Sequence, residues 1–430
     1  MFPAPSDAEA GSSSVTRRPS SVAIRTVLPL GVASKGLAAG VGAQRRRRIG
    51  VGVIGFGWLG QAHTRSLLRI PTLFERRGFD TELVACSDTR PVRLEQAVSS
   101  FGFKRGTAAW QSVIDDSGVD AVFIAAPNMV HVELVQAAAR ARKAVFCEKP
   151  VGGTPEQVAR GARAAREAGV ISGVGYNYRW APLVRYAREL IEGGELGEIT
   201  NYRGRFFSMY GADPLGVNSW RFQLDQAGHG VTSDLMSHAV DLAHMLIGPI
   251  ARVTGTLETF IRERPAPGAG ASHYGRGRPD DPRTPVTNED YAAMLCEFSS
   301  GARGTFEVSR TLVGPESENA FDVYGTRGAV GWNFERLNEL RVYRATEDRG
   351  SGYTTVLGGD RFFHHGTFVP GSGNTIGFED LVTIEDYEFC AAVAEGRPYE
   401  PGFEQALEWA EVQAALLRSV ASGGWEEVRS

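Results

Sequence analysis

Two groups of residues, far apart in the chain, have the types and spacing that proton transfer requires. In one group, Asp234 and His238 are four residues apart and Asp241 follows three residues later. On a helix these side chains share one face, so we expect the Asp234 carboxylate to lie beside the His238 imidazole. Such a carboxylate fixes the tautomer of the ring and raises its basicity, which suits a general base near neutral pH.

The other group is Glu148-Lys149-Pro150, which directly follows an apolar run that ends at Cys147. A lysine at the carboxyl end of a parallel strand lies where open α/β sheets bind ligands. Structural alternatives stay open for both groups. Glu148 and Lys149 also fit a surface ion pair, and Asp234 with His238 also fits a buried structural pair.

Metal binding is a further alternative for the Asp234 group. His229, Asp241 and His244 are close to His238 in the sequence, but together they form no recognised ligand spacing. We therefore expect no metal site.

A glycine pattern near the start of the globular part predicts a dinucleotide site. An apolar strand expected over 49–54 runs into the sequence Gly55-Phe56-Gly57-Trp58-Leu59-Gly60, and a helical pattern begins at Trp58. Gly55 permits a tight turn, Gly57 lets the backbone approach a pyrophosphate, and Gly60 lets the helix lie close to the strand. A plain glycine turn is the alternative, because 52 of the 430 residues are glycine.

Asp88 is the candidate for the adenosine ribose of that dinucleotide. It follows the next expected strand, 82–86, and an acid there accepts hydrogen bonds from ribose hydroxyls and repels a 2′-phosphate. This favours NAD. NADP stays open because Arg90 could bind a 2′-phosphate, and because Asp88 lies further from Gly60 than the usual ~20 residues. We attribute the extra length to an insertion over 72–80. Capping of the next helix is the structural alternative for Asp88.

The elements that must position these residues form two parts of the chain, which differ in their pattern of expected helices and strands. From residue 46 to 175, expected strands alternate with expected helices, which predicts a doubly wound parallel sheet. The strands are 49–54, 82–86, 121–125, 143–147 and 170–175, and the helices are 58–70, 91–101, 129–141 and 154–168.

From residue 176 to 430, longer alternating runs predict an α+β domain with a large, mostly antiparallel sheet. The runs are 198–210, 252–261, 291–298, 303–312, 321–324 and 340–343, with helices expected over 182–192, 233–247, 380–395 and 403–421. Residues 262–288 are rich in Pro, Gly and Arg and are expected to form a mobile loop.

Composition limits the partners and the compartment. The net charge is −4, and residues 1–48 hold eight of the basic residues and only two acids, so the remaining chain is acidic and unsuited to nucleic acid. No apolar run is long enough for a membrane span. The cysteines Cys86, Cys147, Cys296 and Cys390 are widely spaced, as in a cytoplasmic protein with reduced thiols.

Residues 1–45 have no sustained period and are expected to be a disordered extension or the result of a misassigned start. An export signal is the alternative. Thr16-Arg17-Arg18 resembles a twin-arginine motif, but Arg25 and Lys35 interrupt the apolar stretch that should follow.

Together these motifs resemble the glucose–fructose oxidoreductase / inositol dehydrogenase / MocA family over nearly the whole chain from Arg48 to Trp425. Ala126-Pro127-Asn128-x-x-His131 is similar to its cofactor segment and Glu148-Lys149-Pro150 to its E-K-P motif. The further matches are Gly175-Tyr-Asn177-Tyr-Arg179, Trp220-Arg221, Asp234-x-x-x-His238 and the glycine pair of Phe321-x-Val-x-Gly325-x-x-Gly328.

The resemblance implies an NAD(P)-dependent dehydrogenase of sugars, polyols or cyclitols. It implies that Lys149 binds the reacting oxygen, that His238 is the general acid/base and that Asp234 orients it. The residues implied at the cofactor are Gly55, Phe56, Gly57, Trp58, Leu59, Gly60, Asp88, Pro127, Asn128, His131, Glu148 and Lys149. Those implied at the substrate are Asn177, Arg179, Trp220, Arg221, Asp234 and His238.

One departure from the family pattern is Met236, which stands where glycine is common and is expected to reshape the pocket. Two other functions stay open on the same fold. One is hydrolysis of glycosidic bonds by transient oxidation, and the other is a non-catalytic, nicotinamide-binding regulatory role. Relatives commonly pair through the sheet of the second domain, so a homodimer or homotetramer is expected.

Overall fold

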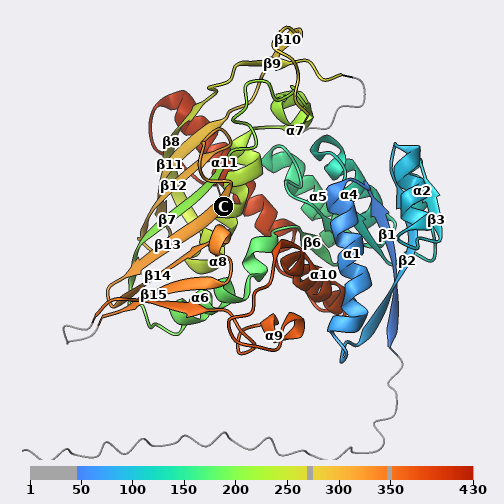
Figure 1. Ribbon diagram of the computed structural model, residues 1–430, viewed down its shortest axis with the longest axis horizontal. Coiled ribbons are helices and arrows are strands. Elements are labelled where there is room, and N and C mark those ends of the chain that lie inside the picture. The colour runs from blue at the N-terminus through green and yellow to red at the C-terminus, as the bar shows by residue number, and fades with distance from the viewer. Residues whose placement is uncertain (1–45, 269–274, 346–350, 430) are drawn as a thin grey trace, which may run out of the picture. The chain divides into compact units, whose positions relative to one another are not determined.

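The computed structural model describes residues 46–268, 275–345 and 351–429 (Figure 1). The extension expected over residues 1–45 lies outside these ranges, as does the middle of the loop expected over 262–288.

Residues 47–174 form a six-stranded sheet in the order β3-β2-β1-β4-β5-β6, and every neighbouring pair is parallel. The strands are β1 (Arg47–Ile54), β2 (Phe79–Ser87), β3 (Arg105–Thr107), β4 (Ala121–Ile124), β5 (Ala144–Cys147) and β6 (Ser172–Val174). The expected doubly wound parallel sheet is confirmed, with β3 as an additional short strand. The strand order reverses between β1 and β4, and ligands bind at such a switch point.

Helices connect these strands on both faces of the sheet (Figure 1). They are α1 (Trp58–Leu73), α2 (Pro91–Ser99), α3 (Gln111–Ile114), α4 (His131–Arg140) and α5 (Pro155–Ala168), with a short 3₁₀ turn over Asn128–Val130. Helix α5 begins with a side-chain N-cap. The Thr154 side chain accepts a hydrogen bond from the Gln157 amide, and Pro155 occupies the first turn.

A second sheet has nine strands in the order β16-β15-β14-β13-β7-β12-β11-β8-β17. It is antiparallel except between β7 and β12, which confirms the expected mostly antiparallel sheet. Its strands are β7 (Ile199–Ser208), β8 (Ile250–Glu258), β11 (Tyr291–Phe298), β12 (Arg303–Ser309), β13 (Ser317–Gly325), β14 (Gly328–Asn333), β15 (Glu339–Arg344), β16 (Tyr353–Leu357) and β17 (Glu426–Glu427).

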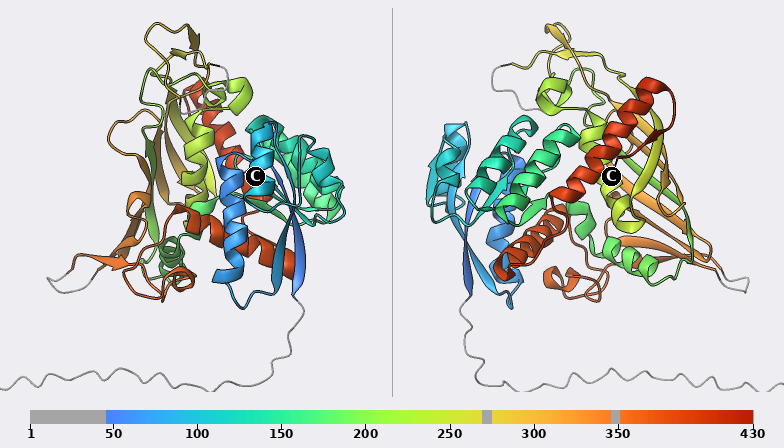
Figure 2. Two further views of the ribbon diagram at one scale, coloured as in Figure 1. Left: turned by 45° about the vertical axis from the view of Figure 1, so that its right-hand side comes forward. Right: turned by 180° about the vertical axis from the view of Figure 1, so that it is seen from behind.

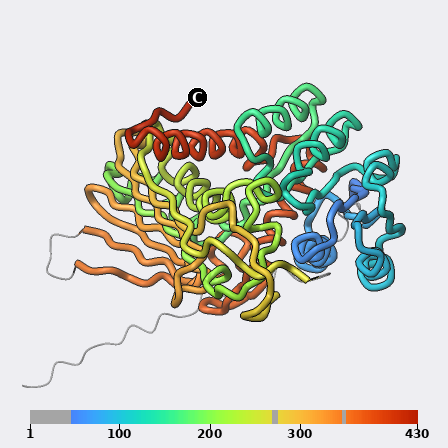
Figure 3. Tube along the Cα trace, turned by 90° about the horizontal axis from the view of Figure 1, so that it is seen from above, coloured from blue at the N-terminus to red at the C-terminus, as the bar shows by residue number. Residues whose placement is uncertain are grey.

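Helices cover one face of the nine-stranded sheet, the face toward the parallel sheet (Figures 1 and 3). They are α6 (Pro182–Glu192), α8 (Ser237–Leu246) and α11 (Phe403–Ser422), and α8 is preceded by a π-helical turn over Thr232–Met236. Along β11 and β12 buried and more exposed residues alternate, so the opposite face of these strands is the more accessible one.

The C-terminal helices return to the parallel sheet. Helix α10 (Phe378–Glu395) packs against α1, and α11 packs against both α5 and β8 (Figure 2). Side chains of α10, including Ile384 and Phe389, are buried in the same core cluster as Val51 of β1. The helix therefore fixes the position of α1, and with it the glycine turn from which α1 begins.

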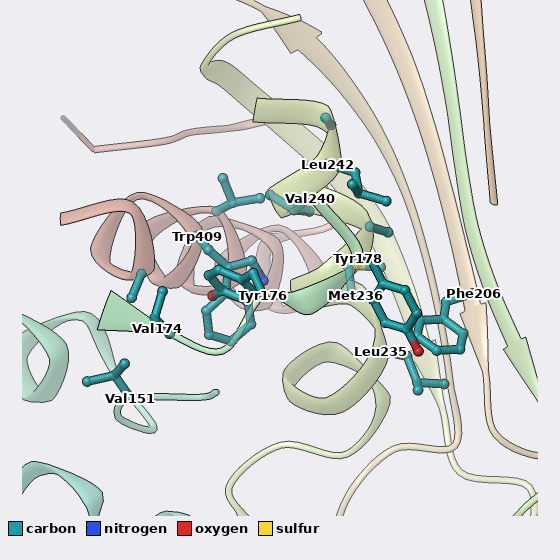
Figure 4. Close-up of a cluster of buried hydrophobic side chains, with 14 of the residues drawn as sticks. Val151, Val174, Tyr176, Tyr178, Phe206, Leu235, Met236, Val240, Leu242 and Trp409 are labelled. Carbon is teal, nitrogen blue, oxygen red and sulfur yellow. The ribbon is translucent and has the colours of Figure 1, made fainter. Parts of the chain in front are cut away.

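The principal core cluster extends from the parallel sheet to the nine-stranded sheet (Figure 4). Met236 belongs to this cluster and is only 2% exposed, and it does not line either of the cavities described below. The Met236 side chain therefore does not narrow either cavity directly, because it packs into the core.

The segment expected to be a mobile loop contains a two-stranded antiparallel ladder of β9 (Glu263–Pro265) and β10 (Arg283–Pro285). The Arg264 guanidinium within it is buried and lies over the Phe222 ring, 4.1 Å from its centroid. The remaining short helices are Asn177–Trp180, Trp220–Phe222, α7 (Leu224–Ala227), Phe334–Arg336 and α9 (His365–Phe368). None of the helices in the described ranges combines the length and hydropathy needed to cross a bilayer.

Candidate active site

Two adjoining cavities lie at the carboxyl edge of the parallel sheet. The first, of about 530 Å³, runs from the glycine turn and Asp88 to Asp234. The second, of about 380 Å³, is lined by His238 and Asn177. Both cavities share one wall, which consists of Trp58, Leu59, Glu148, Lys149, Tyr210, Arg221 and Asp234. The structure thus places a long cleft beside a smaller chamber, with Lys149 between them.

The glycine turn has the geometry that a dinucleotide requires. Gly55 has a φ of +92°, and a Cβ there would lie 2.5 Å from the Ala125 carbonyl oxygen. At Gly57 a Cβ would meet only Arg93, at 3.9 Å, so open space faces the backbone. At Gly60 a Cβ would lie 2.0 Å from the Gly55 oxygen, which shows how closely α1 approaches the turn.

Phe56 and Gly60 lie within the fingerprint but do not line the cleft. The Phe56 ring is fully buried, edge-on to Phe101 and Phe103. The Phe56 ring therefore belongs to the core, and only its backbone lies at the turn, where its amide donates to Asp88.

Asp88 directly follows β2, and its carboxylate accepts hydrogen bonds from the backbone of two neighbouring turns. Oδ2 accepts a hydrogen bond from the Phe56 amide at 2.8 Å, and Oδ1 accepts one from the Arg90 amide at 2.8 Å. Arg93, and not Arg90, forms the ion pair with Asp88 and lines the cleft. The carboxylate therefore both supports the start of α2 and faces the site expected for the ribose.

The segment after β4 closes the cleft on its other side. The Asn128 side chain donates a hydrogen bond to the Ala227 carbonyl oxygen at 3.0 Å, which links this segment to α7. Both ring nitrogens of His131 lie within hydrogen-bond distance of backbone carbonyl oxygens, those of Pro150 and Ala126. Pro127, Asn128 and His131 all line the cleft, and His131 also fixes the loop that carries Lys149.

Lys149 is held by Asp234. Its Nζ donates to Oδ1 and to the backbone oxygen of Asp234, both at 2.8 Å. The Tyr210 hydroxyl donates to the other carboxylate oxygen at 2.9 Å, and Arg221 approaches that oxygen at 3.5 Å. Burial by itself raises the pKa of the Asp234 carboxyl, but the charges of Lys149 and Arg221 hold this pKa well below its ordinary value. Asp234 is therefore ionised at neutral pH.

His238 opens onto the smaller chamber. Its ring lies edge-on to Tyr178, with the ring centroids 4.8 Å apart. Burial, followed by the nearby Lys149 charge, lowers the pKa of His238 well below its ordinary value, so the imidazole is neutral at pH 7. A neutral ring has one nitrogen that can accept a proton.

The expected contact between Asp234 and His238 is not formed. The Asp234 carboxylate is directed to Lys149 and Tyr210, and within the described ranges Nδ1 of His238 is buried without a hydrogen-bond partner. The π-helical turn over Thr232–Met236 explains the difference. Its i→i+5 pattern shifts Asp234 relative to His238, so the α-helical spacing of four residues no longer aligns the two side chains.

Arg179 and Asp241 form a separate buried ion pair. Nη2 of Arg179 lies 2.5 Å from Oδ1 of Asp241, Nε lies 3.0 Å from Oδ2, and neither residue lines a cavity of the site. The expectation that Arg179 contacts the substrate is therefore not met, because its guanidinium is used inside the protein.

The other expected substrate residues reach the cavities. Asn177 lines the smaller chamber, and its buried Nδ2 has no hydrogen-bond partner among the residues that the structure describes. Trp220 lines the larger cleft, and the Arg221 guanidinium lies 4.8 Å from the centroid of its ring. Over the described ranges, His, Cys, Asp and Glu side chains form no group of three that could hold a metal ion.

Two residues of this region were not expected from the sequence. Tyr210 binds Asp234, and its only sequence signal is its place at the end of an expected strand, 198–210. His63 lies three residues after Gly60 and binds Glu148 through Nε2 at 3.0 Å. A histidine on the buried side of the first helix of a dinucleotide fold is the signal that could have identified it.

Known proteins match both parts of the chain. An oxidoreductase family model with an NAD-binding Rossmann fold matches residues 49–176, and a GFO/IDH/MocA C-terminal domain model matches residues 184–331. Levoglucosan dehydrogenase of Pseudarthrobacter phenanthrenivorans is 33% identical over 386 residues, which are 89% of this chain and 98% of the relative. The scyllo-inositol 2-dehydrogenase (NAD(+)) of Bacillus subtilis is 28% identical over 73% of this chain and 81% of the relative.

Solved structures agree with these matches. A levoglucosan dehydrogenase in complex with NADH and levoglucosan superimposes with a TM-score of 0.84 at 32% identity, and the match covers 89% of this chain and 100% of that one. An NAD-binding oxidoreductase from Klebsiella pneumoniae gives a TM-score of 0.83 at 31% identity with the same coverage.

Proposed function

This chain belongs to the GFO/IDH/MocA oxidoreductase family, and we propose that it is an NAD-dependent dehydrogenase of a sugar, polyol or cyclitol. The observation that carries the proposal is that Lys149 and His238 line one chamber, which shares a wall with the cleft above the glycine turn. These two residues supply a fixed cation and a neutral base, which are the groups that oxidation of an alcohol requires.

The residues of the cleft fit a dinucleotide. The backbone at Gly55 and Gly57 would hold the pyrophosphate, helped by the amides at the start of α1. The Asp88 carboxylate would accept hydrogen bonds from the ribose hydroxyls and would repel a 2′-phosphate, which supports NAD over NADP. Asn128 and Glu148 would bound the other end of the cleft. When bound, the nicotinamide supplies the hydride acceptor.

Lys149 would bind the reacting oxygen. An ammonium group has three N–H donors, and in the described part of the chain two of them are directed to Asp234. The third is free to donate to a substrate hydroxyl. A cation fixed in a partly buried wall stabilises the alkoxide that develops as the proton leaves, an effect of roughly 3–4 kcal/mol for a single well-placed donor.

His238 would take the proton. Because burial and the Lys149 charge keep its ring neutral, it can accept a proton from the substrate hydroxyl without first losing one. The rings of Tyr178 and Phe206 pack around it and restrict the access of water. Asp234 acts on this step through Lys149 and not by orienting the imidazole.

The chamber has the character of a carbohydrate site. Aromatic side chains line part of its wall, where an apolar C–H face of a ring could pack, and they include Trp58, Phe334 and Phe378. The amide of Asn177 and the hydroxyls of Ser208 and Ser317 supply polar partners for the substrate hydroxyls. The relatives are named for activity on levoglucosan and inositols, which supports a cyclic polyol or sugar as the substrate of this chain.

We further propose that a second copy of the chain packs on the accessible face of the nine-stranded sheet. A shallow hollow in that face is lined by Arg203, Tyr291 and Leu295, and Leu295 is 51% exposed. Large exposed apolar side chains on a sheet favour association. The four free thiols, all buried, support a reducing compartment such as the cytoplasm.

The proposal is tested by titrating the purified protein with NAD and then adding single compounds, with reduced nicotinamide followed by absorbance. The panel consists of levoglucosan, scyllo-inositol, myo-inositol, glucose and glycerol. We expect turnover with at least one cyclic polyol and none with glycerol. If NAD binds but no cyclic compound of a wider panel is turned over, the dehydrogenase assignment is wrong.

A further inference from the structure

His63 joins two carboxylates beneath the cleft. Its Nδ1 lies 2.9 Å from Oδ1 of Asp386, and its Nε2 lies 3.0 Å from Oε1 of Glu148. His63 is 1% exposed and Asp386 is fully buried. The chain Asp386–His63–Glu148, named here the buried carboxylate network, connects α10 and α1 to the residue that precedes Lys149.

The geometry fixes the net charge of this network. Each of the two N···O contacts needs one proton, so the imidazole and the two carboxylates together hold two protons. Wherever these protons reside, the sum is one net negative charge. Burial by itself lowers the pKa of His63, but Asp386 and Glu148 raise it well above its ordinary value, so both protons are retained at neutral pH.

A third carboxyl group, that of Glu385, is adjacent but does not add to this charge. Both of its oxygens are buried, and neither has a hydrogen-bond partner in the ranges that the structure covers. Burial, followed by the charges of Glu148 and Asp386, raises the pKa of Glu385 well above its ordinary value. Glu385 is therefore protonated and neutral at pH 7.

The negative charge lies at one end of the cleft. Glu148 lines both cavities and follows β5, on the opposite side of β1 from Asp88 and β2. A dinucleotide whose adenosine lies at Asp88 has its nicotinamide at the β4–β5 side. The neighbouring Lys149 and Arg221 cations share the single Asp234 carboxylate, so these three side chains sum to one positive charge, and the network adds one negative charge beside them.

We propose that the negative charge of the buried carboxylate network shifts the redox-state preference of the cofactor site, so that the oxidised dinucleotide binds more tightly, relative to the reduced one, than it would if the network were neutral. The inference rests on the proposed function. The oxidised nicotinamide ring carries a positive charge and the reduced ring does not, so a fixed negative charge in a partly buried wall distinguishes them. Such a preference suits an enzyme that takes up NAD⁺ and releases NADH.

Asp386→Asn tests this proposal because Asp386 touches neither cavity. The substitution keeps the shape of the side chain, and with the introduced amide oxygen accepting from Nδ1 the protonated His63 and the ionised Glu148 form a neutral ion pair. The ring-nitrogen NMR shifts of His63 verify that both nitrogens stay protonated in the variant. The ratio of the NADH Kd to the NAD⁺ Kd, measured by calorimetry without substrate, is expected to fall about tenfold. Glu385→Gln is the matched control on the same helix, and because Glu385 is already neutral the ratio should stay within twofold of wild type.

Glu148→Gln is the second neutralising variant, and it is used if Asp386→Asn does not fold, as judged by near-UV circular dichroism. It should lower the same ratio. An unchanged ratio in a folded neutralising variant overturns the proposal, and so does an equal weakening of both forms, which is what a purely structural role would give. If the wild-type protein binds neither dinucleotide, the proposed function itself fails, a result distinct from binding with an unchanged ratio.

Discussion

Nζ of Lys149 lies 2.8 Å from Oδ1 of Asp234, although the two residues are 85 positions apart in the chain. Lys149 follows a strand of the parallel sheet, and Asp234 lies in the π-helical turn before α8. The contact therefore joins the two parts of the chain at the wall that both cavities share. It fixes the ammonium group without using all of its donors.

Replacing Lys149 by Met should abolish most of the activity while the protein stays folded. The substitution removes the only cation in our mechanism that would contact the reacting oxygen, and loss of one such donor costs about 100-fold to 1,000-fold in kcat. Steady-state kinetics on the best substrate provide the measurement. Lys149→Arg is the matched control for charge, and a Met variant within tenfold of wild type would contradict the assigned role.

Tyr210→Phe should lower kcat, because the Tyr210 hydroxyl helps to hold the Asp234 carboxylate in place against Lys149. The variant loses the hydroxyl that donates to Oδ2 at 2.9 Å, and a hydrogen bond to a charged group contributes about 1.5–3 kcal/mol. We expect kcat to fall by about tenfold, with little change in NAD affinity, because the carboxylate holds Lys149 less firmly. Stopped-flow measurement of the first turnover would separate this effect from product release. Unchanged single-turnover rates would show that Tyr210 is dispensable.

Asp88→Ser should relax the choice between NAD and NADP. Without the carboxylate there is no charge to repel a 2′-phosphate, and Arg93, which now pairs with Asp88, becomes available to bind it. The ratio of kcat/KM for NAD to that for NADP is expected to fall at least about tenfold. Adding Arg93→Ala to this variant should reverse part of the gain, whereas Arg90→Ala should not, since Arg90 does not line the cleft.

Much of this arrangement follows from local sequence rules. The glycine turn is predictable because Gly55 needs a positive φ and Gly60 a close approach, and each requirement excludes a side chain. The two sheets are predictable from strand spacing, since alternation with helices indicates parallel pairing and long alternating runs indicate antiparallel pairing. Lys149 could be selected because it follows an apolar strand at the ligand-binding edge of the sheet, and Asp234 and His238 because of their four-residue spacing.

The rest depends on contacts that sequence spacing does not encode. The π-helical turn redirects Asp234 from His238 to Lys149, and a period-based argument assumes an α-helix throughout. The pairing of Arg179 with Asp241 removes a cation from the site, although its sequence motif suggested a ligand contact. The contact of His63 with Asp386 joins residues 323 positions apart and needed the packing of α10 on α1 to be known.

His238 should give a pH profile without a transition near neutrality. Its folded-state pKa lies well below the ordinary value of 6.5, so the base form is fully present from pH 6.5 to 8. The kcat/KM for alcohol oxidation should therefore be level over this range and fall only at lower pH. His238→Gln should lose about 100-fold or more in kcat, because general-base catalysis contributes that much. A midpoint near pH 6.5 in the wild-type profile would contradict a buried neutral base.

His244 should make the protein sensitive to acid. The ring is buried, and burial, followed by the Arg179 charge, lowers its pKa to about 4, below the value of 6.5 expected when the chain is unfolded. A lowered folded-state pKa means that the unfolded chain binds the proton first. The stability that the neutral ring provides is therefore complete above about pH 6.5 and is lost as the pH falls toward 4.

The measurement for His244 is the free energy of unfolding in urea at pH 7 and pH 5. Between these values the wild type should lose about 2 kcal/mol more than His244→Gln, because the variant has no group to protonate at this position. The buried rings of His131 and His238 titrate in both proteins, so their contributions cancel in the comparison. Equal losses in the two proteins would mean that His244 is charged, or reached by water, in the folded state.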